Sequence, residues 1–112
     1  MDWVGLAKVA ASAATWRIIG LKSAGRTLID ALASPDENVR TIAGMSLVKG
    51  GEKALPLLRD ALSQRRALAT VITIIGDIGG ENALKDIEPF LNDGDAQVQK
   101  ATQSVYRLSG KH

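Results

Sequence analysis

The sequence predicts an all-α fold: a short open solenoid, or α-α superhelix, of about three antiparallel helix pairs preceded by one amino-terminal helix. Two observations predict it. Glycine recurs at a step of 30 residues, at Gly20, Gly50, Gly80 and Gly110. Between these glycines the apolar residues fall at the spacing of amphipathic helices. Because one helix pair cannot bury its apolar face alone, successive pairs must stack and share a core.

The chain is expected to form a single domain, because 112 residues supply only one hydrophobic core. Aromatic residues make up 4% of the sequence, so we expect the core to consist of Leu, Ile, Val and Ala. Each repeat should contribute one pair of antiparallel helices. The glycine period divides the chain into an amino-terminal capping helix and three repeats, at residues 1–24, 25–51, 52–80 and 81–110.

The first and third repeats have recognisable turns between their two helices. Ser34, Pro35 and Glu37 have the order of an N-cap, a first helical position and a capping-box acid, so we expect Ser34 to cap a helix that begins at Pro35. Asp93 and Asp95 occupy the corresponding turn of the third repeat. Helix capping explains these two residues better than calcium binding, which needs about six to eight oxygen ligands.

The middle repeat has no Pro, Gly or Asp between its helices, only the residues 63–66. We expect a tight turn there with Ser63 as the cap. One continuous helix over residues 52–78 is the competing interpretation, but such a rod could not fold its apolar faces back onto the flanking pairs. Pro56 lies close enough to a helix start to be tolerated, whereas Pro89 should bend or break its helix.

The amino-terminal residues predict one longer helix that closes the end of the stack. Trp3 shares its face with several alanines, so we expect Trp3 to be a core residue. Trp16 lies on a different face with Gly5 and Ser12, and we expect it to be an exposed anchor for a partner or for a second copy of the chain. Packing of Trp16 beneath the loop around Leu21 is the alternative.

The repeat units, the turn at residues 34–40 and the run at residues 74–79 resemble short HEAT repeats. More narrowly, they are similar to the HEAT-like units of phycobilisome lyases. The resemblance covers residues 25–110. It implies an open, right-handed superhelix of antiparallel helix pairs and a role in protein–protein recognition or scaffolding.

The resemblance also implies a ladder of charges between repeats, formed by the Asp of the turn and by the Arg that directly follows the Val after the turn. Asp36, Arg40 and Asp95 match this pattern. Gln99 stands where the third repeat would have its Arg, and the middle repeat lacks the turn Asp. We therefore expect an incomplete ladder.

No catalytic, cofactor or metal site is expected, and the chain is not predicted to be an enzyme. It contains no Cys, and its single His is the last residue, His112, which excludes Cys–His and Ser–His–Asp sets. The glycine-rich residues 76–80 indicate a helix C-cap and turn, because no strand precedes them and no Lys-Ser or Lys-Thr follows. A bilin-lyase-like or other ligand-binding role is the enzymatic alternative, although the chain is short for enclosing a chromophore.

The expected partner is a protein or a peptide. The formal net charge is only +2, and scattered Lys and Arg residues make weak nucleic-acid binding a less favoured alternative. The partner should bind the concave side of the stack, lined by the second helix of each repeat. The repeat register places these residues there: Thr41, Met45, Lys49, Thr73, Asp77, Lys100 and Ser104. A homodimer is a further option.

A cytoplasmic location and no membrane span are expected. Lys8 and Arg17 interrupt the apolar stretch at residues 3–21, which is also rich in alanine. The amino end carries Asp2 in place of the basic cluster of a signal peptide. We therefore interpret this stretch as a packed helix.

Overall fold

The computed structural model describes the backbone of residues 2–19, 22–79 and 81–109, and their side chains apart from residues 14–24 and 81. Within these ranges all regular structure is helical, which confirms the all-α prediction. The helices are α1 (Trp3–Ile19), α2 (Lys22–Ala31), α3 (Glu37–Gly50), α4 (Leu55–Ser63), α5 (Leu68–Ile78), α6 (Glu81–Ile87) and α7 (Ala96–Leu108). Two 3₁₀ turns, η1 (Gly51–Ala54) and η2 (Glu88–Phe90), lie before α4 and after α6.

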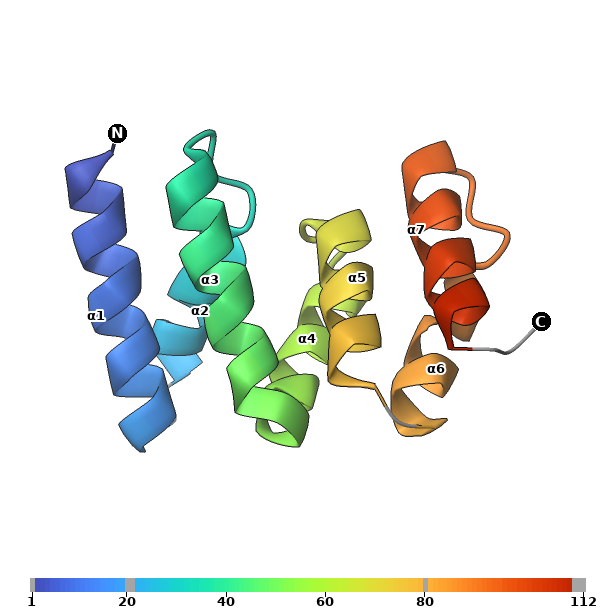
Figure 1. The fold of residues 1–112 in the computed structure, drawn as a ribbon, viewed down its shortest axis with the longest axis horizontal. Coiled ribbons are helices and arrows are strands. Elements are labelled where there is room, and N and C mark those ends of the chain that lie inside the picture. Colours follow the sequence, from blue (N-terminus) through green and yellow to red (C-terminus); the bar gives the residue numbers. More distant parts are fainter. Residues whose placement is uncertain (1, 20–21, 80, 110–112) are drawn as a thin grey trace.

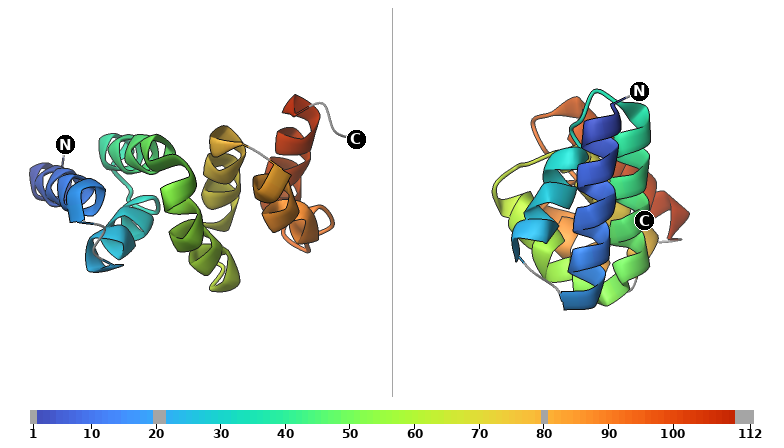
Figure 2. Two further views of the ribbon diagram at one scale, coloured as in Figure 1. Left: turned by 90° about the horizontal axis from the view of Figure 1, so that it is seen from below. Right: turned by 90° about the vertical axis from the view of Figure 1, so that its left-hand side faces the viewer.

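The helices form two layers that run along an elongated stack of 41 × 27 × 23 Å. One layer holds α1, α3, α5 and α7, and the other holds α2, α4 and α6 (Figure 1; Figure 2). Helix α1 packs against both α2 and α3, and the row continues through contacts of α3 with α5 and of α5 with α7. The amino-terminal helix therefore extends the layer of second helices by one position.

The core lies between the two layers and consists mainly of aliphatic side chains, as the composition predicts. The largest side chains with almost no exposure are Val9, Leu28, Leu47, Leu58, Val71, Ile72, Ile75, Ile87 and Thr102. Thr102 is the one polar residue buried in the described core. Its hydroxyl donates to the carbonyl of Val98 at 2.8 Å, so burial leaves it satisfied.

The turn before α3 uses a different cap from the predicted one. Asp36 has extended backbone geometry, and its carboxylate accepts a hydrogen bond from the Asn38 N–H at 2.8 Å. The hydroxyl of Ser34 instead accepts from the Asp36 N–H at 3.1 Å. The prediction that Ser34 caps a helix beginning at Pro35 is therefore wrong, because the turn is longer by two residues and Asp36 reaches the free N–H groups. Asp95 caps α7 in the same way, as predicted.

Helices α4 and α5 are separate, which excludes the continuous helix considered for residues 52–78. The predicted Ser63 cap is wrong, because the Ser63 hydroxyl donates back to the carbonyl of Asp60 at 2.8 Å. The N-cap residue of α5 is Ala67, which makes no side-chain cap. Arg65 and Ala67 have φ angles of 53° and 44°, in the left-handed region. Two left-handed residues thus reverse the chain without a glycine.

We expect Ala67→Gly to raise the free energy of unfolding by up to about 1 kcal/mol. An L-residue in the left-handed region is strained by about 1–2 kcal/mol, and glycine removes that strain at some cost in the entropy of the unfolded chain. Ala69→Gly is the matched control, because Ala69 lies inside α5. Glycine at this position should lower the free energy of unfolding by about 1 kcal/mol. Urea denaturation measures both. A lower midpoint for Ala67→Gly would contradict the strained turn.

Proline and glycine act at the helix ends as predicted. Pro56 occupies the first turn of α4, and Pro89 lies in η2, where the α-helical pattern of α6 has already ended. Gly79 has a φ of 81° and its N–H bonds to the Ile75 carbonyl, which confirms a helix C-cap at the end of α5. None of the described helices combines the length and hydropathy that crossing a bilayer requires.

The prediction that Trp3 is a core residue is wrong. Trp3 is 74% exposed, and α1 packs through Val9 and Ala13, which are 1% and 5% exposed. Val9 lies about 120° around the helix from Trp3. The alanine-rich face is the longer apolar stripe, but the face of Val9 provides the larger side chain for the core. The side chain of Trp16 lies outside the described residues, so the predicted contact role of Trp16 stays a prediction.

Three ion pairs between described residues join the repeats, and each of these uses an arginine of the middle repeat. Arg66 pairs with Asp30 of α2 at 3.4 Å, and Arg59 pairs with Asp86 of α6 at 2.7 Å. Arg65 makes two hydrogen bonds to Asp93, at 2.9 and 3.1 Å. Arg40, the residue expected in a ladder, instead donates to the Ser34 carbonyl. The charged connections therefore run from the middle repeat to both neighbours.

Acid is expected to weaken this network. The side-chain hydrogen bond from Arg65 lowers the pKa of Asp93 below its usual value of 3.8, and the Asp95 N–H lowers it further. A carboxyl group whose pKa is lower in the folded state contributes stability above the unfolded pKa, and this is lost as the pH falls through the folded pKa. We therefore expect the urea concentration at the unfolding midpoint to decrease once the pH is lowered below about 4.

The control for this prediction is Asp93→Asn, which should have a lower midpoint at neutral pH and a weaker acid dependence. The Asp2 N–H likewise lowers the pKa of Asp36, so part of the acid dependence should remain. Urea titrations between neutral pH and about pH 2 measure both proteins. Parallel midpoint curves for the two proteins would show that Asp93 is not responsible.

Candidate partner-binding surface

The residues predicted to face a partner lie on the solvent side of α3, α5 and α7. Ser104 is half-buried, and the other six side chains are exposed: Thr41, Met45, Lys49, Thr73, Asp77 and Lys100. Their helices bury the opposite sides through Leu47, Ile75 and Thr102. The helical register of the sequence therefore places all seven side chains away from the core.

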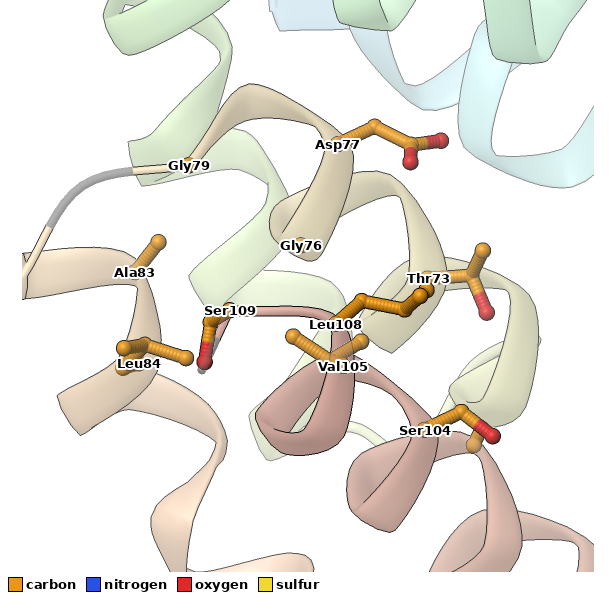
Figure 3. Close-up of a pocket in the computed structure, with 11 residues that line it drawn as sticks. Thr73, Gly76, Asp77, Gly79, Ala83, Leu84, Ser104, Val105, Leu108 and Ser109 are labelled. Atoms are coloured by element: carbon orange, nitrogen blue, oxygen red, sulfur yellow. The ribbon is translucent and has the colours of Figure 1, made fainter. Parts of the chain in front are cut away.

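Only part of this set converges on a hollow. Thr73, Asp77 and Ser104 line a groove of ≈ 450 Å³ between α5, α6 and α7 (Figure 3). Thr41, Met45 and Lys49 belong to α3, and neither they nor Lys100 line this groove. The described residues of the lining are Thr73, Gly76, Asp77, Gly79, Ala83, Leu84, Ala101, Ser104, Val105, Leu108 and Ser109.

Small residues leave the volume of the groove open. Gly76, Ala83 and Ala101 come from three different helices and bring little or no side chain. Helix α7 lies so close to α5 here that a Cβ atom on Gly76 would be 2.6 Å from a methyl carbon of Val105. Glycine at this position thus sets the distance between the two helices that form the groove.

The walls are apolar. Leu84 of α6 and Val105 and Leu108 of α7 contribute their side chains, and Leu108 is 87% exposed. Tyr106 fixes α7 against α6, because its hydroxyl donates to the Leu84 carbonyl at 2.9 Å. Burial raises the pKa of the Tyr106 hydroxyl, and Glu88 adds to this effect, so the hydroxyl stays a hydrogen-bond donor at neutral pH.

The polar groups at the rim differ in their availability. The Thr73 hydroxyl donates to the Ala69 carbonyl at 3.0 Å, and the Ser104 hydroxyl accepts from Arg107 at 3.1 Å. Asp77 has no hydrogen bond or ion pair with any residue that the structure describes. Among the lining residues that the structure describes, Asp77 is also the only ionisable one. The groove thus offers apolar contact and one unpaired carboxylate.

The chemistry of the described lining is simple. Its described residues supply hydroxyl groups and the Asp77 carboxylate, but no His, Lys or Cys. Across the described part of the chain, no three His, Cys, Asp or Glu side chains gather as metal ligands would. The groove can hold an apolar group and place a positive charge beside Asp77.

The sequence alone did not identify the apolar members of this groove. The predicted binding residues do not include Leu84, Val105 or Leu108. One signal was present, because Leu108 follows Ser104 by four residues and therefore continues its helical face. The contribution of α6 depends on how the third repeat packs, which residue spacing does not specify.

Comparison with known proteins agrees with the repeat architecture. Residues 25–106 match the family model described as HEAT repeats. The chain is 33% identical over 107 residues to the phycocyanobilin lyase subunit alpha of Picosynechococcus sp. (strain ATCC 27264 / PCC 7002 / PR-6), an alignment that covers 81% of this chain and 40% of that protein. The chain thus corresponds to less than half of that relative's length. No solved structure matches the chain.

Proposed function

The chain belongs to the HEAT-repeat family, and from this premise we propose that it is a small non-catalytic module that binds a protein or peptide partner on the exposed side of α3, α5 and α7. The observation that supports this most directly is the groove between α5, α6 and α7, which is apolar and open to solvent. Concave apolar sites with a few polar groups are the usual form of binding sites. Stacked repeats commonly present such surfaces to partners.

The chemistry of the groove defines the segment that would fit. One or two apolar side chains of the partner would contact Leu84, Val105 and Leu108. A Lys or Arg of the partner next to them would pair with the carboxylate of Asp77, which has no partner among the described residues. Exposed charge pairs contribute little affinity, so the apolar contacts provide most of the affinity. Asp77 provides the preference for segments that carry a Lys or Arg.

The test is a selection of displayed random peptides on the immobilised protein, followed by fluorescence-polarisation titration of the best peptide. We expect selected peptides to carry an apolar residue beside Lys or Arg. Leu108→Asp should weaken binding at least about tenfold, which is about 1.4 kcal/mol, because it places a charge in the apolar wall. Asp77→Lys should remove the preference for basic peptides.

The matched control is Gln103→Ala, an exposed position of α7 that does not line the groove. The affinity of the Gln103→Ala variant for the selected peptide should equal that of the unchanged protein. Circular dichroism of each variant confirms that the helices are intact. Peptides without basic residues, or equal binding by Leu108→Asp and Gln103→Ala, would contradict the groove as the binding site.

A second candidate function is lyase-like handling of a bilin, which the name of the relative favours. The described part of the groove lining opposes it, because the described residues supply one carboxylate and no Lys or Arg, whereas a linear tetrapyrrole carries anionic propionate groups. Mixing the protein with phycocyanobilin separates the two functions. A shifted visible absorption band on binding would favour the lyase-like role, and an unchanged spectrum would favour the peptide-binding role.

A further inference from the structure

The two ends of the stack differ in their surface chemistry. At the amino-terminal end, α1 has no helix on its outward side (Figure 1; Figure 2). Trp3 and Val4 are 74% and 80% exposed there. They share an arc of about 120° with three exposed alanines. Lys8 lies beside one edge of this arc, and the helical position of Arg17, near the end of α1, lies beside the other edge. The apolar face of α1, called here the α1 face, consists of Trp3, Val4, Ala7, Ala10 and Ala11.

The carboxyl-terminal end is polar by contrast. The exposed side of α7 carries Lys100, Gln103 and Arg107, and its exposed leucine, Leu108, belongs to the groove. The α1 face is apolar instead, although it continues the same helix layer. Exposed apolar residues grouped on one face indicate an interaction site.

We propose that the α1 face binds the α1 face of a second copy of the chain in a two-fold symmetric dimer. The alternative arrangement of copies, head to tail, would bury Lys100 and Arg107 of α7 against an apolar surface flanked by Lys8. That contact would desolvate two positive charges with no opposite charge on the α1 face to compensate them. A contact between the same face on two copies gives a closed dimer.

The residue order of the α1 face suits an antiparallel pair of helices. With the two-fold axis at Ala7, Trp3 of one copy lies opposite Ala11 of the other, and Val4 lies opposite Ala10. Large side chains then meet small ones, so the two helices can approach closely. The second α1 would extend the row formed by α1, α3, α5 and α7.

The contact consists of one helix packed against another. We expect it to bury less surface than the about 1,200 Å² at the lower end of standard interfaces. We therefore expect a reversible dimer that forms at micromolar to millimolar concentrations. Sedimentation equilibrium over this range measures its dissociation constant. Trp3→Ser should raise that constant at least about tenfold, because it removes the largest side chain of the contact.

Leu108→Ser is the matched control, because Leu108 is at least as exposed as Trp3 but lies at the other end of the stack. It should leave the dissociation constant unchanged. Trp3→Ser should also keep the thermal midpoint of the dilute protein, because Trp3 makes little contact with the core. A lower midpoint in dilute solution would mean that Trp3 stabilises the monomer, and this would overturn the assignment.

Cross-linking tests the symmetry. The sequence contains no cysteine, so Ala7→Cys introduces a single thiol. In a two-fold dimer with its axis at Ala7, mild oxidation should join two copies through this thiol, whereas Leu108→Cys should stay monomeric under the same conditions. The proposal is overturned if the protein stays monomeric at millimolar concentration, if Trp3→Ser dimerises as the unchanged protein does, or if only Leu108→Cys cross-links.

Discussion

Replacing Gly76 with alanine is expected to lower the free energy of unfolding by up to about 2 kcal/mol. The new methyl group would lie 2.6 and 2.8 Å from the two methyl carbons of Val105, closer than carbon atoms can approach. Moving α7 away costs about 1–3 kcal/mol, and the better helix propensity of alanine returns about 1 kcal/mol. The same shift should deform the groove, so peptide binding should weaken together with stability.

Gly44 provides the matched control for this substitution. It lies in α3 five residues after a buried valine, Val39, just as Gly76 follows Val71 in α5. A methyl group on Gly44 would be 3.9 Å from Leu32 and 4.0 Å from Ile74, which is ordinary contact. Gly44→Ala should therefore raise the free energy of unfolding by up to about 1 kcal/mol. Urea denaturation of both variants should show midpoint shifts of opposite sign.

The clash with Val105 can be tested directly. Val105→Ala in the Gly76→Ala background removes the two methyl carbons that the new Cβ meets. The double variant should then be more stable than the sum of the two single changes predicts. Additive effects would show that the cost of Gly76→Ala arises elsewhere.

Leu47→Ala is expected to cost about 2–5 kcal/mol, the largest effect among these substitutions. Leu47 has no measurable exposure and lies in the core between the two helix layers. Truncation removes its buried apolar area and leaves a cavity that the packed neighbours fill only in part. Thermal or urea denaturation, followed by circular dichroism, measures the loss.

Met45 is the control for Leu47 on the same helix. It is 54% exposed and belongs to the predicted binding side of α3. Met45→Ala should change the free energy of unfolding by less than about 0.5 kcal/mol. Similar losses for the two variants would show that α3 is rotated relative to its described orientation, and the binding side would then have to be reassigned.

The helical fold could be predicted because its signal is local and repeated. The spacing of residues such as Leu28 and Ile72 fixes which side of each helix is buried, and Gly79 marks a helix end. The errors occurred where two local signals competed. Ser34 and Asp36 are both good caps, and the backbone geometry of the turn decides between them. The helical face of Trp3 is uniformly apolar and therefore predicts a core position, although Val9 lies on the face that packs.

The candidate site could be predicted only in part, for a related reason. Thr73, Asp77 and Ser104 follow from the helical register, since each lies opposite a buried residue of its own helix. The groove itself depends on contacts between three helices. The close approach at Gly76 and the position of α6 are properties of the packing, and no spacing within one helix encodes them.

The arginines of the middle repeat also affect how cooperatively the stack unfolds. Arg66 reaches back to the first repeat, while Arg59 and Arg65 reach forward to the third, so one repeat supplies the charged coupling at both junctions. Salt screens both junctions together, and the two ends of a stack with weakened junctions melt more independently. Both tryptophans lie in α1 and the single tyrosine lies in α7, so fluorescence of the first and absorbance of the second report the two ends separately. At low ionic strength these signals should change in one transition, and added salt should move them apart.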